Sequence, residues 1–427
     1  MKKELVIYGV SVGINRGAIL ILMPFLLHIF TVQDFGLYSY VQLLFQLGSP
    51  IVSLNVIIAM SREGADHPSK ALYIYNNFLL TLLFITMGLA AFCYLLTLVN
   101  VEFIYVWILL LAGVEAWHNM LLSYYRAAEK NWIFLFFSIL KTLGLLLVFS
   151  ILYWQVPNAS LNYYLLIQFI WSLVIGFLFH IGINKRTEAK DVISLKESIT
   201  SSLVLIPHTL SLWIIASAGR FFLKELWGNY ELGVYSKVFN VAMILMIVNS
   251  GIGIALPQQI IKNYKQWIVG SIRSSFFKYY SVVAIILYFL LIVGIWCDNN
   301  YFQLYNIDFY KNGFNFLFIY VGFYLLGFYY VYSNILFALR KNKILALITT
   351  VTAVLSVMLN YILILNFKML GASVSVVTTY LIYYFLTFFY TLKYEKQFKK
   401  SKSEIYIVLA VTSALFLLTW LFGAAIN

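Results

Sequence analysis

Four basic residues lie inside long apolar stretches of the chain: Arg16, Lys141, Arg220 and Lys237. A cation at the centre of a membrane-spanning helix costs about 2.5–3.5 kcal/mol on insertion scales, so each of them needs a compensating partner or a wet surface. Glu115 is the one acidic residue in these stretches. The apolar part of the chain therefore carries a net positive charge, which disfavours the binding of a cationic ligand.

Glu115 and Lys141 lie on two apolar segments, 103–125 and 131–154, that are joined by a short turn. Glu115 precedes this turn by about as many residues as separate the turn from Lys141, so a helical hairpin places both side chains at the same depth. We expect an ion pair, which is either structural or holds an acid that exchanges protons. His118 lies one helical turn from Glu115 and either shares that proton or makes a structural hydrogen bond.

Arg16 lies beside a ridge of small residues. In the stretch GVSVGINRG, Gly9, Gly13 and Gly17 are spaced by four residues and share one helix face, which lets another helix pack closely. Arg16 and Asn15 lie off this ridge, and we expect them to face the interior of a helix bundle. The alternative is that Arg16 caps carbonyl groups of a kinked neighbouring helix.

Arg220 and Lys237 flank the short loop between the apolar segments 200–223 and 232–256. They either line the same interior as Arg16 or extend their charged ends to the membrane–water interface.

The composition identifies the elements that must position these residues. Of the 427 residues, 63% are hydrophobic and 11% are charged, which excludes a soluble domain because its surface needs more charge. No motif indicates a metal, a cofactor or ATP. Apolar runs long enough to cross a bilayer as helices recur along the whole chain. We predict an all-α polytopic membrane protein with thirteen spans, near residues 5–30, 36–60, 72–99, 103–125, 131–154, 161–183, 200–223, 232–256, 277–297, 313–338, 343–366, 370–391 and 405–425.

The distribution of lysine and arginine predicts the orientation, because these residues accumulate on the cytoplasmic side of a membrane. With the N-terminus in the cytoplasm, 22 basic residues, Arg273 among them, fall in cytoplasmic segments. The outer loops then hold only Lys224, Lys311 and Lys368. This bias places the N-terminus inside and the C-terminus outside, and it explains the net charge of +13 without a nucleic-acid surface.

An internal repeat divides the chain. The sequence DFGLYS at 34–39 recurs as ELGVYS at 231–236, and its glycines, Gly36 and Gly233, favour a tight turn. We predict two parallel copies of a six-helix lobe, 1–190 and 191–395, followed by a basic cytoplasmic loop and an extra C-terminal helix in 396–427. Duplicated bundles of this kind are typical of transporters with a substrate site between the halves, although a scaffold is the alternative.

Four prolines lie in equivalent helices of the two copies: Pro24, Pro50, Pro207 and Pro257. Proline removes a backbone hydrogen bond and kinks a helix. These kinks serve either as hinges for alternating access or as packing features.

Two stretches resemble a known family. PFLLHIFTVQDFGLYS (24–39) and GRFFLKELWGNYELGVYSK (219–237) are similar to the matching segments of bacterial O-antigen and polysaccharide flippases, which belong with the MATE exporters to the MOP superfamily. Two residues depart from the family pattern: His28 stands where arginine is usual, and Gly219 stands where an aspartate usually precedes Arg220.

The resemblance implies a transporter, not an enzyme, in the bacterial cytoplasmic membrane. Its substrate would be an undecaprenyl-diphosphate-linked O-antigen or other surface-polysaccharide repeat unit, flipped to the outer leaflet by alternating access. The implied partners are this lipid-linked glycan, membrane lipids, a coupling proton or sodium ion, and other polysaccharide-assembly membrane proteins. The diphosphate would meet a cationic lumen, because arginine and lysine neutralise phosphate. The residues expected in this lumen are Arg16, Asn15, Lys141, Arg220 and Lys237.

Three alternatives remain open. A MATE-like exporter of cationic compounds would need embedded acids, and this chain has one against four bases. A membrane polysaccharide polymerase or glycosyltransferase generally has a large outer loop or an acidic catalytic motif. A scaffold for glycan assembly is the third.

Overall fold

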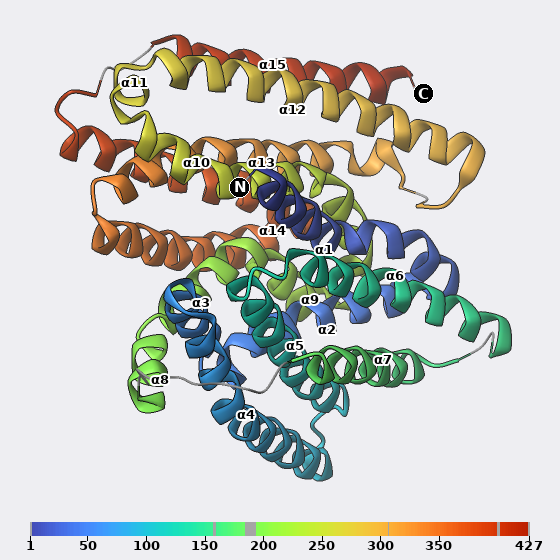
Figure 1. The fold of residues 1–427 in the computed structure, drawn as a ribbon. Coiled ribbons are helices and arrows are strands. Elements are labelled where there is room, and N and C mark those ends of the chain that lie inside the picture. The colour runs from blue at the N-terminus through green and yellow to red at the C-terminus, as the bar shows by residue number, and fades with distance from the viewer. Residues whose placement is uncertain (1, 157–158, 184–193, 306, 399–401, 426–427) are drawn as a thin grey trace. The chain divides into compact units, whose positions relative to one another are not determined.

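The computed structural model describes residues 2–156, 159–183, 194–305, 307–398 and 402–425 (Figure 1). All regular structure in these ranges is helical. The described residues form fifteen α-helices and two single helical turns, Thr97–Val99 and Asp298–Phe302. The helices are α1 (Lys2–Ile29), α2 (Val32–Val52), α3 (Val56–Asp66), α4 (Pro68–Leu96), α5 (Ile104–Ala127), α6 (Asn131–Gln155), α7 (Leu161–Ile181), α8 (Leu195–Leu203), α9 (Ile206–Ala242), α10 (Ile244–Lys262), α11 (Tyr264–Val269), α12 (Ser271–Cys297), α13 (Phe309–Ala338), α14 (Asn342–Tyr394) and α15 (Lys402–Ala425).

The helices confirm the predicted all-α membrane fold. Among the described residues, nine helices are long and apolar enough to cross a membrane, and two bent pairs, α2 with α3 and α8 with α9, raise this number to eleven. The 53-residue α14 is two helices joined at Lys368, and α9 is two helices joined at Gly228. Each of the thirteen predicted spans therefore corresponds to a helical segment.

The breaks inside α9 and α14 have non-helical backbone angles, and side-chain contacts connect one break to the other. Gly228 has φ 86° and Lys368 has φ 49°, the left-handed region that helices avoid. The Lys368 ammonium lies 4.2 Å from the Trp227 ring and 3.7 Å from the Glu231 carboxylate. The Trp227 indole N–H donates to the Ile364 carbonyl oxygen at 2.9 Å. These contacts tie the break in α9 to the break in α14.

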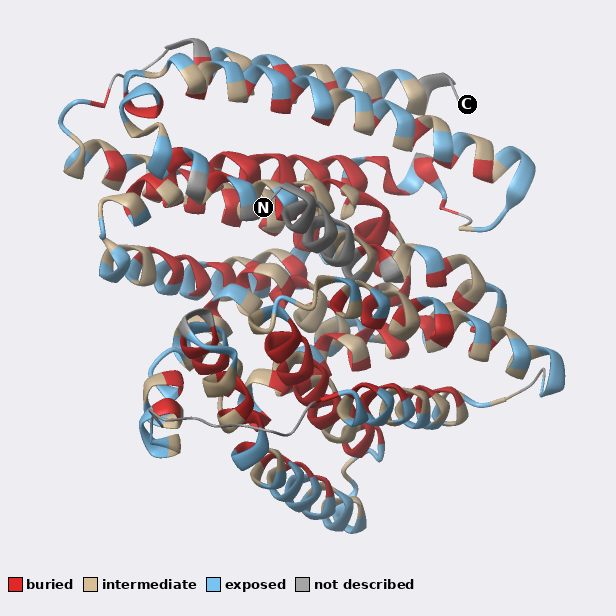
Figure 2. Cartoon of the chain, in the orientation of Figure 1, coloured by how far each residue is buried: buried red, intermediate tan, exposed pale blue. Residues whose placement is uncertain are grey.

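The chain forms two compact units. One consists of residues 1–18 and 37–210, and the other of residues 19–36 and 211–427. In the first, α5 is buried along most of its length and contacts α3, α4, α6 and α7; in the second, α13 is buried in the same way and contacts α10, α12, α14 and α15 (Figure 2). The division into lobes at 190 and 395 stays a prediction.

Two of the four prolines lie close to helix breaks. Pro50 precedes the 65° bend between α2 and α3, and Pro207 follows the 42° bend between α8 and α9. Pro24 and Pro257 lie inside the helices α1 and α10. Their role as hinges stays a prediction.

Candidate functional site

The charged residues of the first unit meet between α5 and α6. The Lys141 ammonium lies 2.7 Å from a carboxylate oxygen of Glu115, so the ion pair expected from their equal depth is confirmed. Both side chains keep part of their surface, 25% for Lys141 and 20% for Glu115. The pair is therefore shielded from bulk solvent but not sealed within the helix packing.

His118 lies next to this pair and is fully buried. Its Nε2 atom is 2.8 Å from the carbonyl oxygen of Ser172. Because a carbonyl only accepts, Nε2 carries the proton and Nδ1 presents a lone pair. Among the described residues, Nδ1 has no hydrogen-bond partner. This arrangement leaves His118, one helical turn from Glu115, with one proton-accepting nitrogen.

Arg220 and Lys237 are the two predicted lumen residues that lie in the second unit, and the surroundings of Arg220 are the better defined. Its guanidinium carbon lies 4.4 Å from the centre of the Phe239 ring, and one of its nitrogens lies 3.4 Å from the Ser217 hydroxyl. Its Nε atom is buried, and no described residue forms a hydrogen bond with it. In the part of the chain that the structure describes, neither Arg220 nor Lys237 forms an ion pair with a carboxylate.

The five residues expected in a cationic lumen thus differ in the unit to which they belong and in whether a carboxylate neutralises them. Lys141 belongs to the first unit and is neutralised by Glu115. Arg220 and Lys237 belong to the second unit and lack such a partner among the described residues. The side chains of Asn15 and Arg16 lie outside the described residues.

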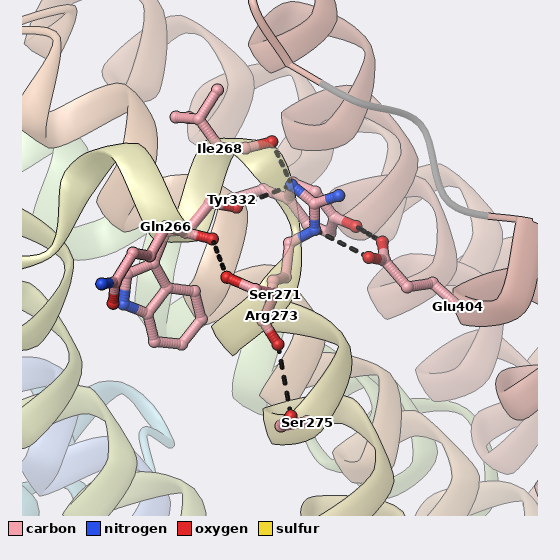
Figure 3. Close-up of polar contacts among 8 residues, drawn as sticks. Gln266, Ile268, Ser271, Arg273, Ser275, Tyr332 and Glu404 are labelled. Carbon is pink, nitrogen blue, oxygen red and sulfur yellow. Dashed lines mark hydrogen bonds and ion pairs between the residues drawn. The ribbon is translucent and has the colours of Figure 1, made fainter.

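The sequence analysis missed one charged cluster, which lies in the second unit (Figure 3). Arg273 was placed in a cytoplasmic segment between two spans, and the structure locates it in the first turn of α12 with 0% of its side chain exposed. Its Nε donates to the Glu404 carboxylate at 2.8 Å, and one Nη donates to the Trp267 carbonyl oxygen at 2.9 Å. The Tyr332 hydroxyl donates to the second Glu404 oxygen at 3.1 Å.

This cluster joins four helices: α11, α12, α13 and α15. The guanidinium also lies 3.9 Å from the centre of the Phe398 ring, which covers it from the chain segment before α15. A fully buried arginine that is paired with a carboxylate and with backbone carbonyls is not available to a substrate. The cluster is therefore structural, and it attaches α15 to α12, with which it lies side by side (Figure 1).

Comparisons with known proteins identify the fold. No protein-family model matches the chain, and no curated protein matches its sequence. Among solved structures, the lipid II flippase MurJ in an inward closed conformation superposes with a TM-score of 0.64 at 14% identity, covering 99% of this chain and 95% of that one. A multidrug resistance MATE family transporter in an outward-facing conformation gives 0.62 at 14% identity, covering 93% and 96%.

A MOP superfamily transporter from Pyrococcus furiosus, described as having a binding pocket of reversed polarity, gives a TM-score of 0.60 at 13% identity and covers 94% of this chain and 97% of that one. All three likenesses span nearly the whole length of both chains. This chain has the fold of the MATE and MOP superfamily transporters.

Proposed function

We propose that this protein is a flippase that moves an undecaprenyl-diphosphate-linked O-antigen or other surface-polysaccharide repeat unit to the outer leaflet of the bacterial cytoplasmic membrane. The N-terminus lies in the cytoplasm, and transport proceeds by alternating access between the two halves of the repeat.

One observation carries this proposal: Arg220 is held inside the second unit without a carboxylate among the described residues. A guanidinium within a membrane-spanning helix is costly unless an anion or water satisfies it. Its planar fork matches the oxygens of a phosphate group. Phe239 supports one face of the guanidinium, and its unpaired Nε leaves a donor for a ligand. A diphosphate supplies the missing negative charge.

The contrast with the other embedded cations supports the same substrate class. Lys141 and Arg273 each have a carboxylate at 2.7–2.8 Å, whereas Arg220 and Lys237 have none in the described ranges. An exporter of cations would need the opposite pattern. The fold itself accommodates a lipid II flippase as well as multidrug transporters, so it is compatible with a lipid-linked substrate.

Glu115 and His118 are the groups that we assign to ion coupling. The carboxylate and the ammonium of Lys141 are in contact, and His118 lies one helical turn from Glu115, so a proton that reaches Glu115 weakens its pairing with Lys141. A proton or a sodium ion entering this site would therefore change the packing of α5 against α6.

Deletion of the gene tests the proposal. We expect lipid-linked repeat units to accumulate in the cytoplasmic leaflet, measured by their protection from an enzyme added outside spheroplasts. Accumulation of single repeat units in the outer leaflet would instead indicate a polymerase. An unchanged distribution would exclude both.

Complementation of the deletion strain with Arg220→Ala tests the residue. We expect export to fall about tenfold or more at equal membrane levels, because a hydrogen bond to a charged group contributes about 1.5–3 kcal/mol. Lys311→Ala is the matched control, since it removes one positive charge from the same unit at a side chain that is 77% exposed. Equal export by the two variants would contradict the role of Arg220.

A further inference from the structure

The repeated sequence motif makes a reciprocal contact. Gly36, in the first turns of α2, lies against the backbone of α9, where an added Cβ atom would overlap the carbonyl oxygen of Asn229 and lie 2.9 Å from the Gly233 nitrogen. A Cβ atom added to Gly233 would overlap the carbonyl oxygen of Val32 and lie 3.0 Å from the Val32 side chain. Neither glycine can be replaced by a larger residue unless the two helices separate.

The two halves of this contact are equivalent by sequence. Val32 precedes Gly36 by four residues, and Asn229 precedes Gly233 by four residues. The glycine of each copy therefore touches the backbone one helical turn before the glycine of the other copy. We call this four-residue contact, Val32, Gly36, Asn229 and Gly233, the glycine crossing. It replaces the tight turn expected from the sequence, because both glycines lie inside helices and neither has a positive φ.

The glycine crossing consists mainly of close contacts between the backbones of two helices. Each glycine lies against a backbone carbonyl of the other helix, which supports close approach but supplies only weak individual interactions. Its members belong to the second unit, whereas α2 passes into the first unit directly after Gly36. In the described chain, residues 19–36 are the part of the N-terminal copy that joins the second unit, and the crossing lies at the end of that segment.

We infer that the glycine crossing is a gate, on the side of the membrane that the charge bias predicts to be outside. The gate is closed when the glycines touch and opens when α2 and α9 separate there to release the substrate. This inference rests on the proposed transport function, because only a transporter needs this contact to open. Each copy of the repeat supplies one glycine and one carbonyl, so the gate closes symmetrically.

A labelling experiment on the purified protein in detergent tests the gate without any substrate. Cys93 and Cys297 are first replaced by serine, and a reporter cysteine is placed at Leu232, which is 1% exposed beside Gly233. We expect a maleimide to label this cysteine slowly in the parent and at least severalfold faster after Gly36→Ala. Gly88→Ala is the matched control, because a Cβ atom there meets nothing within 4 Å.

Unfolding is separated from opening by a second reporter. A cysteine at Ala284, which is 0% exposed in α12, should label slowly in every variant if the unit stays folded. Faster labelling at both positions would mean that Gly36→Ala unfolds the unit, and the cross-link described next then decides the question. Unchanged labelling at Leu232 after Gly36→Ala would overturn the gate.

A reversible cross-link tests the gate from the opposite direction. Cysteines at Val32 and Asn229, both partly exposed, are joined in cells of the deletion strain by a bifunctional thiol reagent that contains a cleavable disulfide. We expect surface polysaccharide, measured by periodate staining, to stop appearing and to resume after reduction. Normal export by the cross-linked protein would overturn the gate while leaving the flippase proposal intact. Surface polysaccharide on the deletion strain without any copy of the protein would instead count against the proposed function.

Discussion

The ammonium of Lys141 and the carboxylate of Glu115 meet at 2.7 Å across the hairpin of α5 and α6. They are 26 residues apart and lie on opposite sides of one short turn. Two antiparallel helices that rise 1.5 Å per residue keep such residues level. The pair therefore follows from the hairpin geometry. It places the Glu115 carboxylate in contact with a positive charge that stabilises its ionised form.

Removing either partner of this pair should lower the stability of the protein by more than half of the loss caused by removing both. Glu115→Gln and Lys141→Met each leave one charge without its partner, whereas the double variant leaves none. We expect a coupling of about 0.5–3 kcal/mol in a double-mutant cycle based on thermal unfolding in detergent. Additive losses would show that the two charges do not stabilise each other.

Arg273→Ala should be strongly destabilising, because it leaves Glu404 buried and unpaired. Breaking a buried ion pair on one side costs about 3–5 kcal/mol. Lys311→Ala is the matched control: Lys311 pairs with Asp308 at 3.2 Å, but the two side chains are 77% and 46% exposed, and a surface pair contributes about 0–1 kcal/mol. The thermal midpoints of the two variants in detergent check this difference, and similar midpoints would contradict it.

Arg16 should affect export more than insertion. Arg16→Ala makes α1 more apolar, so we expect normal membrane levels and a loss of most export. Arg16→Lys should recover part of the export, since it restores the charge but not the bidentate fork. Export is measured per molecule in the deletion strain. If membrane levels fall in step with export for both variants, Arg16 has a packing role instead.

The C-terminus should lie outside the cytoplasm. A reporter that is active only outside the cytoplasm, fused after Asn427, should be active, while the same reporter fused after Lys341, between α13 and α14, should be inactive. An inactive but well-expressed fusion at Asn427 would show that α15 does not cross the membrane.

Sequence reasoning was sufficient for features that depend on neighbouring helices. The spans follow from apolar runs, and the pairing of Glu115 with Lys141 follows from a single hairpin. Arg273 and Glu404 are 131 residues apart, and no depth argument connects helices that are not consecutive. A basic residue near a predicted helix end is also the usual sign of a cytoplasmic loop, so the burial of Arg273 had no local signal.

The glycine crossing is a second feature that the sequence pattern could predict only in part. The repeat identified Gly36 and Gly233 as equivalent, but a glycine that permits a turn and a glycine that permits close helix packing have the same sequence signature. The structure separates the two interpretations through the backbone atoms that each glycine faces. The roles of the prolines and of Arg220 depend on a moving protein with its substrate, which no sequence pattern encodes.

The pairing of Arg273 with Glu404 also determines when, during synthesis of the chain, the second unit can finish folding. A ribosome adds roughly 5–20 residues per second. The 131 residues between the partners therefore take about 7–26 seconds to synthesise. Throughout this interval Arg273 has been made, while the carboxylate that neutralises it does not yet exist. The second unit can complete its packing only when the last helix has been made. A chain that is truncated before residue 402 would keep Arg273 without its carboxylate, and we expect quality-control proteases of the membrane to degrade it.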